Sequence, residues 1–193
     1  MRPPSAPLSV IKSISQRALA RHWREIATDR RLPVFGDFSP TSRMHDPQQL
    51  MFWDVKGAPD RFCFKTLRHG QYLTEAFGID PPPLQPLETV VPPALQDVVI
   101  SGLRTCAEVR APLYTIVSAQ DQSAHPIHCE RLLLPFGNDG DEPQQIVASL
   151  QVISIDGKFT RQNVVELFAA QAQLTYVVEI SFGDATRPAV DSK

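Results

Sequence analysis

The alternation of apolar and polar positions along the chain predicts helices and strands in a definite order. Apolar residues at helical spacing predict helices over residues 8–30, 94–109 and 160–174, with Ser9 as the N-cap of the first. Runs rich in β-branched and aromatic residues predict strands over residues 50–55, 61–69, 111–119, 127–136 and 144–154, and a strand or extended arm over 175–182. A short helical stretch is expected between Gly70 and Gly78.

This order of elements predicts the class of fold. Two hairpin strands, a helical region and three consecutive antiparallel strands indicate an α+β domain with one five-stranded antiparallel sheet and helices on one face. We expect three parts: an amphipathic helix within residues 1–30, the domain itself over 31–155, and a helix and strand extension over 156–193.

The N-terminal helix has an apolar stripe that must be covered. The stripe consists of Ile11, Ile14, Ala18, Leu19, Trp23 and Ile26. Two partners are expected equally, the sheet of the same chain and a second copy of the chain. In the second case these residues form a dimer helix.

Composition indicates an ordinary globular protein. The 193 residues are 42% hydrophobic and 21% charged, and the apolar runs are too short for a membrane span or a signal peptide. Three cysteines, Cys63, Cys106 and Cys129, show no repeated spacing, so neither a disulfide framework nor a zinc motif is indicated. We expect a cytoplasmic protein that makes no contact with membranes.

Charge is distributed unevenly along the chain. Residues 1–31 hold seven Lys or Arg and two Asp or Glu, a balance of +5, whereas the rest holds 12 basic and 19 acidic residues, a balance of −7. A basic arm with Arg17, Arg21, Arg24, Arg30 and Arg31 keeps nucleic acid as an alternative partner. No aromatic stacking platform accompanies these arginines, so we do not favour this alternative.

The segment HPIHCE, residues 125–130, suggests metal or thiol chemistry at first sight. On a strand, however, His125 and His128 point to opposite faces, and so do His128 and Cys129. Phosphate-binding, nucleophile-elbow and zinc-protease motifs are absent from the sequence. We therefore expect no metal site, no catalytic residues and no enzymatic activity.

Several segments, taken in order, resemble a known family. These are LP-x3-D-F-x-P at 32–40, the strand leading into G-x6-FG at 70–78, and E-R-x-L-L-P at 130–135 followed by an acidic glycine turn. The chain resembles the single-domain PAS-like proteins of α-proteobacteria over roughly residues 22–155. It departs from them in the proline-rich segment GIDPPPLQP, which often borders the ligand cavity of such domains.

The resemblance implies a sensory or regulatory module without catalysis, which binds a small apolar or mixed ligand or a protein partner. Its output would pass through an unidentified signalling partner or a homodimer, with a ligand-free dimeric adaptor as the alternative, and no particular cofactor is indicated. The expected pocket is lined by Trp53, Phe62, Phe64, Tyr72, Phe77, Leu103, Tyr114, Ile116, Glu130, Leu132 and Leu134.

Glu130 is the most informative polar residue of this set. If Leu132 and Leu134 face inward, Glu130 does too, and a buried carboxylate needs a partner. Arg68 and Arg110 are the expected partners, and Glu130 then anchors either an ion pair or a polar group of a ligand.

Overall fold

The computed structural model of the chain describes residues 2–39, 47–59, 61–71, 74, 84–120, 126–138, 141–154 and 172–183. Its strands are β1 (Ser5–Pro7), β2 (Leu50–Lys56), β3 (Cys63–His69), β4 (Leu113–Gln120), β5 (Pro126–Phe136), β6 (Gln145–Ser154) and β7 (Gln173–Ser181). The α-helices are α1 (Ile14–Ala27), α3 (Leu87–Val90) and α4 (Pro93–Val109), and short 3-10 turns lie at Leu8–Val10, Phe35–Asp37 and Pro47–Gln49.

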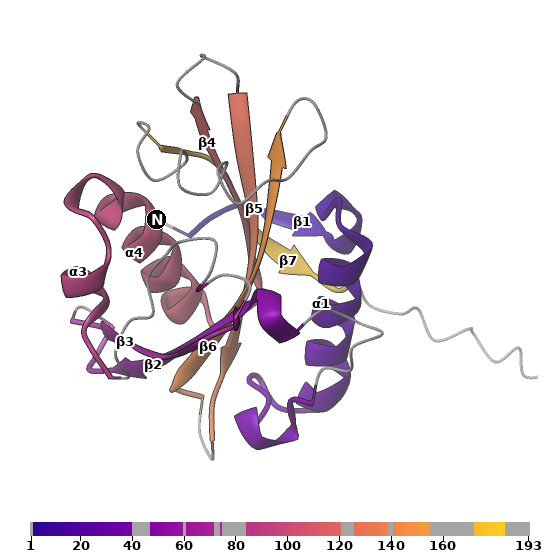
Figure 1. Cartoon of the computed structure of the whole chain (residues 1–193). Helices are drawn as coiled ribbons and strands as arrows, with labels where there is room; N and C mark the ends of the chain where they lie inside the picture. Colours follow the sequence, from indigo (N-terminus) through magenta and orange to yellow (C-terminus); the bar gives the residue numbers. More distant parts are fainter. Residues whose placement is uncertain are drawn as a thin grey trace, which may run out of the picture.

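The strands form one mixed sheet. Their order is β1-β7-β4-β5-β6-β2-β3, and every neighbouring pair is antiparallel except β1 and β7, which are parallel. β5 therefore lies in the middle of the sheet. Helices α3 and α4 cover one face, and α1 covers the other (Figure 1). We call these the α4 face and the α1 face.

The α+β class is confirmed, and all six predicted strands are present with ends shifted by at most two residues. The finer prediction of a five-stranded antiparallel sheet with helices on one face is wrong. β7 and β1 extend the sheet beyond β4, so segments expected as appendages belong to the sheet itself. The predicted helix over 160–174 lies almost wholly outside the described residues, as does most of the stretch between Gly70 and Gly78.

Helix α1 begins later than its apolar pattern indicates. A 3-10 turn occupies Leu8–Val10, and the N-cap is Ser13, whose side chain accepts a hydrogen bond from the Gln16 backbone N–H at 3.3 Å. The predicted cap, Ser9, is therefore wrong. Leu19 and Trp23 are buried against the chain's own sheet, and the Trp23 indole donates to the Pro135 carbonyl at 2.7 Å.

The α4 face has its own core. It joins Trp53 and Phe64 from the β2–β3 hairpin to Leu103 of α4 and Leu133 of β5. Because both faces are covered, every residue of β5 from Cys129 to Phe136 is buried. A strand covered on both faces lacks the alternation of apolar and polar residues that identifies an inward face.

Both edges of the sheet end in short proline-containing segments. β1 is three residues long and ends at Pro7. At the opposite edge, the Thr66 N–H of β3 donates to the Gln85 carbonyl at 3.2 Å, and an isolated bridge joins Lys65 to Pro86.

Candidate functional site

The central strand β5 carries two charged residues into the interior. Glu130 and Arg131 are adjacent, so their side chains point to opposite faces of the sheet. Glu130 is 1% exposed on the α1 face, and Arg131 is 6% exposed on the α4 face. Buried charges are costly unless they are paired and hydrogen-bonded, so the surroundings of each decide what it can do.

Arg131 is held by neutral oxygen atoms. Its Nε donates to the Thr115 Oγ1 at 3.0 Å, and its Nη2 donates to the Val98 carbonyl of α4 at 3.1 Å. Thr115 is the residue opposite Arg131 on β4 and is itself fully buried. No carboxylate among the described residues forms an ion pair with Arg131. Burial lowers the pKa of Arg131, because desolvation disfavours the charged form.

Helix α4 has a glycine where it passes over this guanidinium. A Cβ added to Gly102 would lie 2.8 Å from the Arg131 Nη2 and 3.6 Å from the Leu133 Cδ1. Any other residue at position 102 would force the guanidinium to move. Glycine inside a helix costs about 1 kcal/mol relative to alanine, so the space above Arg131 is kept at a measurable cost in stability.

Two uncharged residues of β5 lie on the same face as Arg131. Leu133 is buried two residues later and Cys129 two residues earlier on the strand. Burial raises the pKa of the Cys129 thiol to about 11, so this thiol stays protonated at neutral pH. A protonated thiol is a poor nucleophile.

Glu130 lies in a different setting on the α1 face. The Lys12 Nζ is 3.6 Å from its Oε1, and Lys12 itself is 70% exposed. Gln16 of α1 donates to the Glu130 backbone carbonyl at 3.3 Å and to the Ser149 carbonyl at 3.0 Å. The Tyr114 hydroxyl lies close enough to the Glu130 carboxylate to interact with it, although neither carboxylate oxygen accepts a well-formed hydrogen bond from the described residues. Burial, together with the nearby Glu130 carboxylate, raises the pKa of Tyr114, so the phenol stays protonated.

The predicted partners of Glu130 are wrong. The Arg68 guanidinium lies over the Phe52 ring, 4.3 Å from its centroid, and Arg110 pairs with Glu142. Lys12 takes their place because the segment before α1 passes across the α1 face, which the sequence pattern did not indicate.

The structure divides the predicted pocket residues between the two faces. Trp53, Phe62, Phe64 and Leu103 belong to the core of the α4 face. Tyr114, Ile116, Leu132 and Leu134 pack on the α1 face, where Glu130 also points. Tyr72 and Phe77 lie outside the described residues. The β4 and β5 residues of the predicted set thus share one face, whereas those of β2, β3 and α4 lie on the other, so the set does not line a single pocket.

The apolar stripe of the N-terminal helix packs on the chain's own sheet, the first of its two expected partners. Ile11, Leu19 and Trp23 are buried there, and Ala18 and Ile26 are half-buried. Ile14 is the exception, with 77% of its surface exposed. These residues do not form a free face for a second copy of the chain.

Of the two histidines in the HPIHCE segment, His128 points away from Cys129. His125 lies outside the described residues, and the exposed His128 contacts the Ser118 hydroxyl through Nδ1 at 2.9 Å. Within the described ranges, no three or more His, Cys, Asp or Glu side chains gather in a way that could hold a metal ion.

The sequence did not predict that Arg131, Thr115 and Gly102 lie together. The burial of Arg131 could have been predicted from the strand pattern: adjacent strand residues point to opposite faces, so Arg131 is buried opposite Glu130 when both faces of the sheet are covered.

Comparison of the chain with known protein families, with curated proteins and with solved structures finds no match. None of the helices in the described part of the chain is long and apolar enough to cross a membrane.

Proposed function

We propose that this chain is a regulatory module of the PAS-like kind, which binds a small molecule on the α4 face and signals through protein contacts. The ligand offers an acidic group to Arg131 and an apolar body to the residues around it. The observation that carries the proposal is a guanidinium buried in an apolar core without a carboxylate partner among the described residues.

The energetic cost of this arrangement supports a role in binding. Burying an ion costs several kcal/mol even after relaxation, and hydrogen bonds to Thr115 and Val98 offset only part of that cost. A methionine of similar length would fill the same space without a charge. The buried charge of Arg131 and the helical Gly102 both lower the stability of the fold. Features that lower stability without a structural need are typical of functional sites.

The surroundings of Arg131 indicate the class of ligand. Ligand sites are mostly apolar with a few polar groups that fix orientation, which fits Arg131 between the buried Cys129 and Leu133 on the same face of β5. A guanidinium binds a carboxylate through two parallel hydrogen bonds. We therefore expect a monocarboxylate with an apolar body. The PAS-like resemblance of the sequence supports a sensory role for such binding, with the signal passed to a protein partner or through a homodimer.

The test compares ligands that differ only in the acidic group. Native mass spectrometry of freshly purified protein first shows whether a small acid is retained, and decanoate and decanol are then compared by thermal unfolding. We expect decanoate to raise the melting temperature more than decanol does. In Arg131→Met this preference should vanish, whereas Arg104→Met, at an exposed position on α4, should keep it.

Equal effects of the acid and the alcohol on the wild-type protein would overturn the proposal. So would a preference for decanoate that Arg131→Met leaves intact. The buried arginine would then have a structural role alone.

A further inference from the structure

A second charged region lies at the edge of the sheet, away from Arg131. A cleft of about 290 Å³ is lined by Arg2, Arg24, Arg31, Arg110, Glu179 and Phe182, among others. The four arginines come from four separate segments: the N-terminus, the last turn of α1, the loop after it, and the residue that follows α4. We call this region the arginine cleft.

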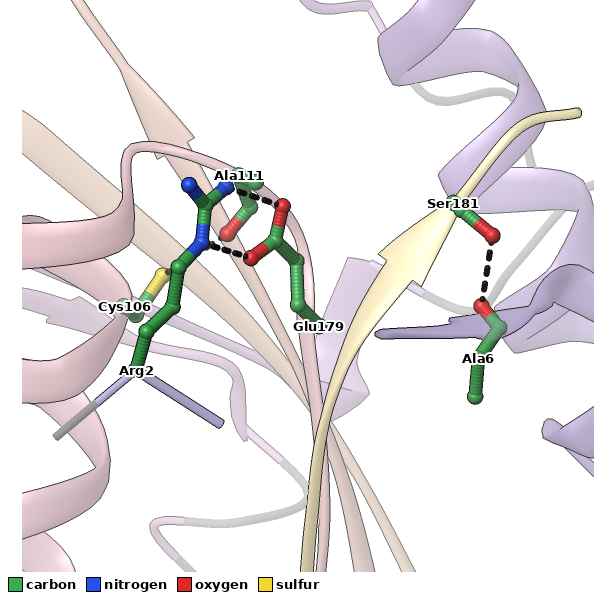
Figure 2. A network of polar contacts seen from close by, with 6 residues as sticks. All are labelled: Arg2, Ala6, Cys106, Ala111, Glu179 and Ser181. Atoms are coloured by element: carbon green, nitrogen blue, oxygen red, sulfur yellow. Dashed lines mark hydrogen bonds and ion pairs between the residues drawn. The ribbon is translucent and has the colours of Figure 1, made fainter. Parts of the chain in front are cut away.

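Contacts between residues 2–6 and strand β7 hold one side of the arginine cleft in place. Figure 2 shows the Arg2 guanidinium against the Glu179 carboxylate, with both hydrogen bonds at 2.7 Å, and the Ser181 hydroxyl donating to the Ala6 carbonyl at 3.1 Å. The Glu179 N–H also donates to the Pro4 carbonyl at 2.9 Å. These contacts hold in place an N-terminal arginine that would otherwise be poorly ordered.

Glu179 does not balance the positive charge of the cleft. Its carboxylate is occupied by Arg2 through two parallel hydrogen bonds. Arg110 pairs with Glu142, whose side chain is 63% exposed, so water and ions can compete for that pair. Neither Arg24 nor Arg31 forms an ion pair with any residue that the structure describes. The cleft therefore keeps an excess of positive charge.

The helix ends explain part of this charge but not all of it. Arg24 lies in the last turn of α1, and Arg110 caps α4 in a left-handed conformation with φ 58°. Each helix C-terminus is equivalent to about half a negative charge, which a basic residue stabilises. Arg31 lies beyond the end of α1 and serves neither helix end, yet it lines the same cleft.

We propose that the arginine cleft binds a phosphate group, either free phosphate or the phosphate of a small phosphorylated molecule. Guanidinium groups match the geometry of phosphate oxygens, and several converging arginines suit a dianion better than a single carboxylate. The volume of about 290 Å³ fits a phosphate with a small body attached. Phe182, which stacks on Trp23 at 6.1 Å between ring centroids, gives that body an apolar wall. This site is independent of the one at Arg131.

The experiment is a titration of the full chain with inorganic phosphate at constant ionic strength, followed by calorimetry and thermal unfolding. We expect saturable binding that raises the melting temperature, and an affinity about tenfold lower or weaker still in Arg24→Gln/Arg31→Gln. Both side chains are exposed, so this variant should fold. Arg21→Gln, an exposed position on α1 that does not line the cleft, is the matched control and should bind as the wild-type protein does.

The source of the phosphate group is identified by repeating the titration with glycerol 3-phosphate. Tighter binding than inorganic phosphate assigns a phosphorylated small molecule, and equal or weaker binding assigns free phosphate. The proposal is overturned if phosphate acts no differently from chloride at equal ionic strength, or if the double variant binds phosphate as the wild-type protein does. It is also overturned if a short single-stranded oligonucleotide binds more tightly than either phosphate compound, which would assign the arginines to nucleic acid.

Discussion

The two faces of the sheet provide different partners for a buried charge, although both charged residues are neighbours on β5. On the α1 face, Glu130 has a counter-charge within the chain, because Lys12 reaches it from the surface. On the α4 face, Arg131 has only the neutral oxygens of Thr115 and Val98, under a glycine that leaves room for it. The charge on the α1 face therefore has a counter-charge from its own chain, whereas the charge on the α4 face has no carboxylate partner among the described residues.

The largest expected effect tests whether the α1 face is an intrachain core. Trp23→Ala removes a buried indole and its hydrogen bond to Pro135, and should lower the free energy of unfolding by about 3–5 kcal/mol. Urea denaturation measures the loss. Ile14→Ala, on the exposed side of the same helix, should change stability by less than about 0.5 kcal/mol. A small loss in Trp23→Ala, accompanied by conversion of a dimer to monomers, would contradict this assignment.

The next prediction tests whether Gly102 makes room for the Arg131 guanidinium. Gly102→Ala places a methyl group against the guanidinium and should cost about 1–3 kcal/mol, despite the better helix propensity of alanine. In an Arg131→Met background the same change should stabilise the protein by about 0.5–1 kcal/mol, because the clash is relieved and the propensity remains. A double-mutant cycle in urea measures both values, and equal effects in the two backgrounds would show that Gly102 does not serve Arg131.

A smaller effect is expected at the ion pair of the α1 face. Lys12→Met removes the counter-charge of Glu130 and should cost about 1 kcal/mol at neutral pH, a modest value because Lys12 is largely exposed to solvent. The loss should disappear in a Glu130→Gln background, where position 130 carries no charge for Lys12 to balance. A loss that persists in that background would assign the contribution of Lys12 to packing of its stem.

The smallest effect concerns pH. The pKa of Tyr114 is raised on folding, so the unfolded chain loses this proton first and stability falls as pH rises past the ordinary tyrosine pKa. At pH 10 the contribution is about 0.4 kcal/mol, from the half-ionised phenol of the unfolded chain. Tyr114→Phe should match the wild type closely at pH 7 and lose less stability between pH 8 and pH 10. Parallel slopes for the two proteins over this range would contradict the assignment.

The pattern of the sequence predicted the helices and strands better than it predicted which face of the sheet each side chain points to. The predicted strand ends lie near the observed ones because each strand is bounded by polar or proline-rich turns, and α4 was predicted to within one residue of its observed start. The β4 and β5 residues of the expected pocket were grouped with residues of the opposite face, because a strand such as β5 that is buried on both faces has no polar side to show which helix covers it.

Long-range pairing was beyond what periodicity can show. The three residues of β1 carry no alternation, and their parallel pairing with β7 joins opposite ends of the chain. The same limit hid the pairing of Lys12 with Glu130 and the convergence of four arginines on one cleft. The composition of the basic arm was visible, but the placement of Arg24 and Arg31 beside Arg110 follows only from the folded sheet.

The proline-bounded edges of the sheet restrict how this protein can assemble. Proline has no N–H to donate, so a strand that ends in it offers a poor template for a further strand. One edge ends in β1 with Pro7, and the other is covered by the segment through Pro86. Extension of the sheet from one copy into the next is thus disfavoured at β3 and at β1, although β1 pairs with only Glu179–Ser181 of the longer β7.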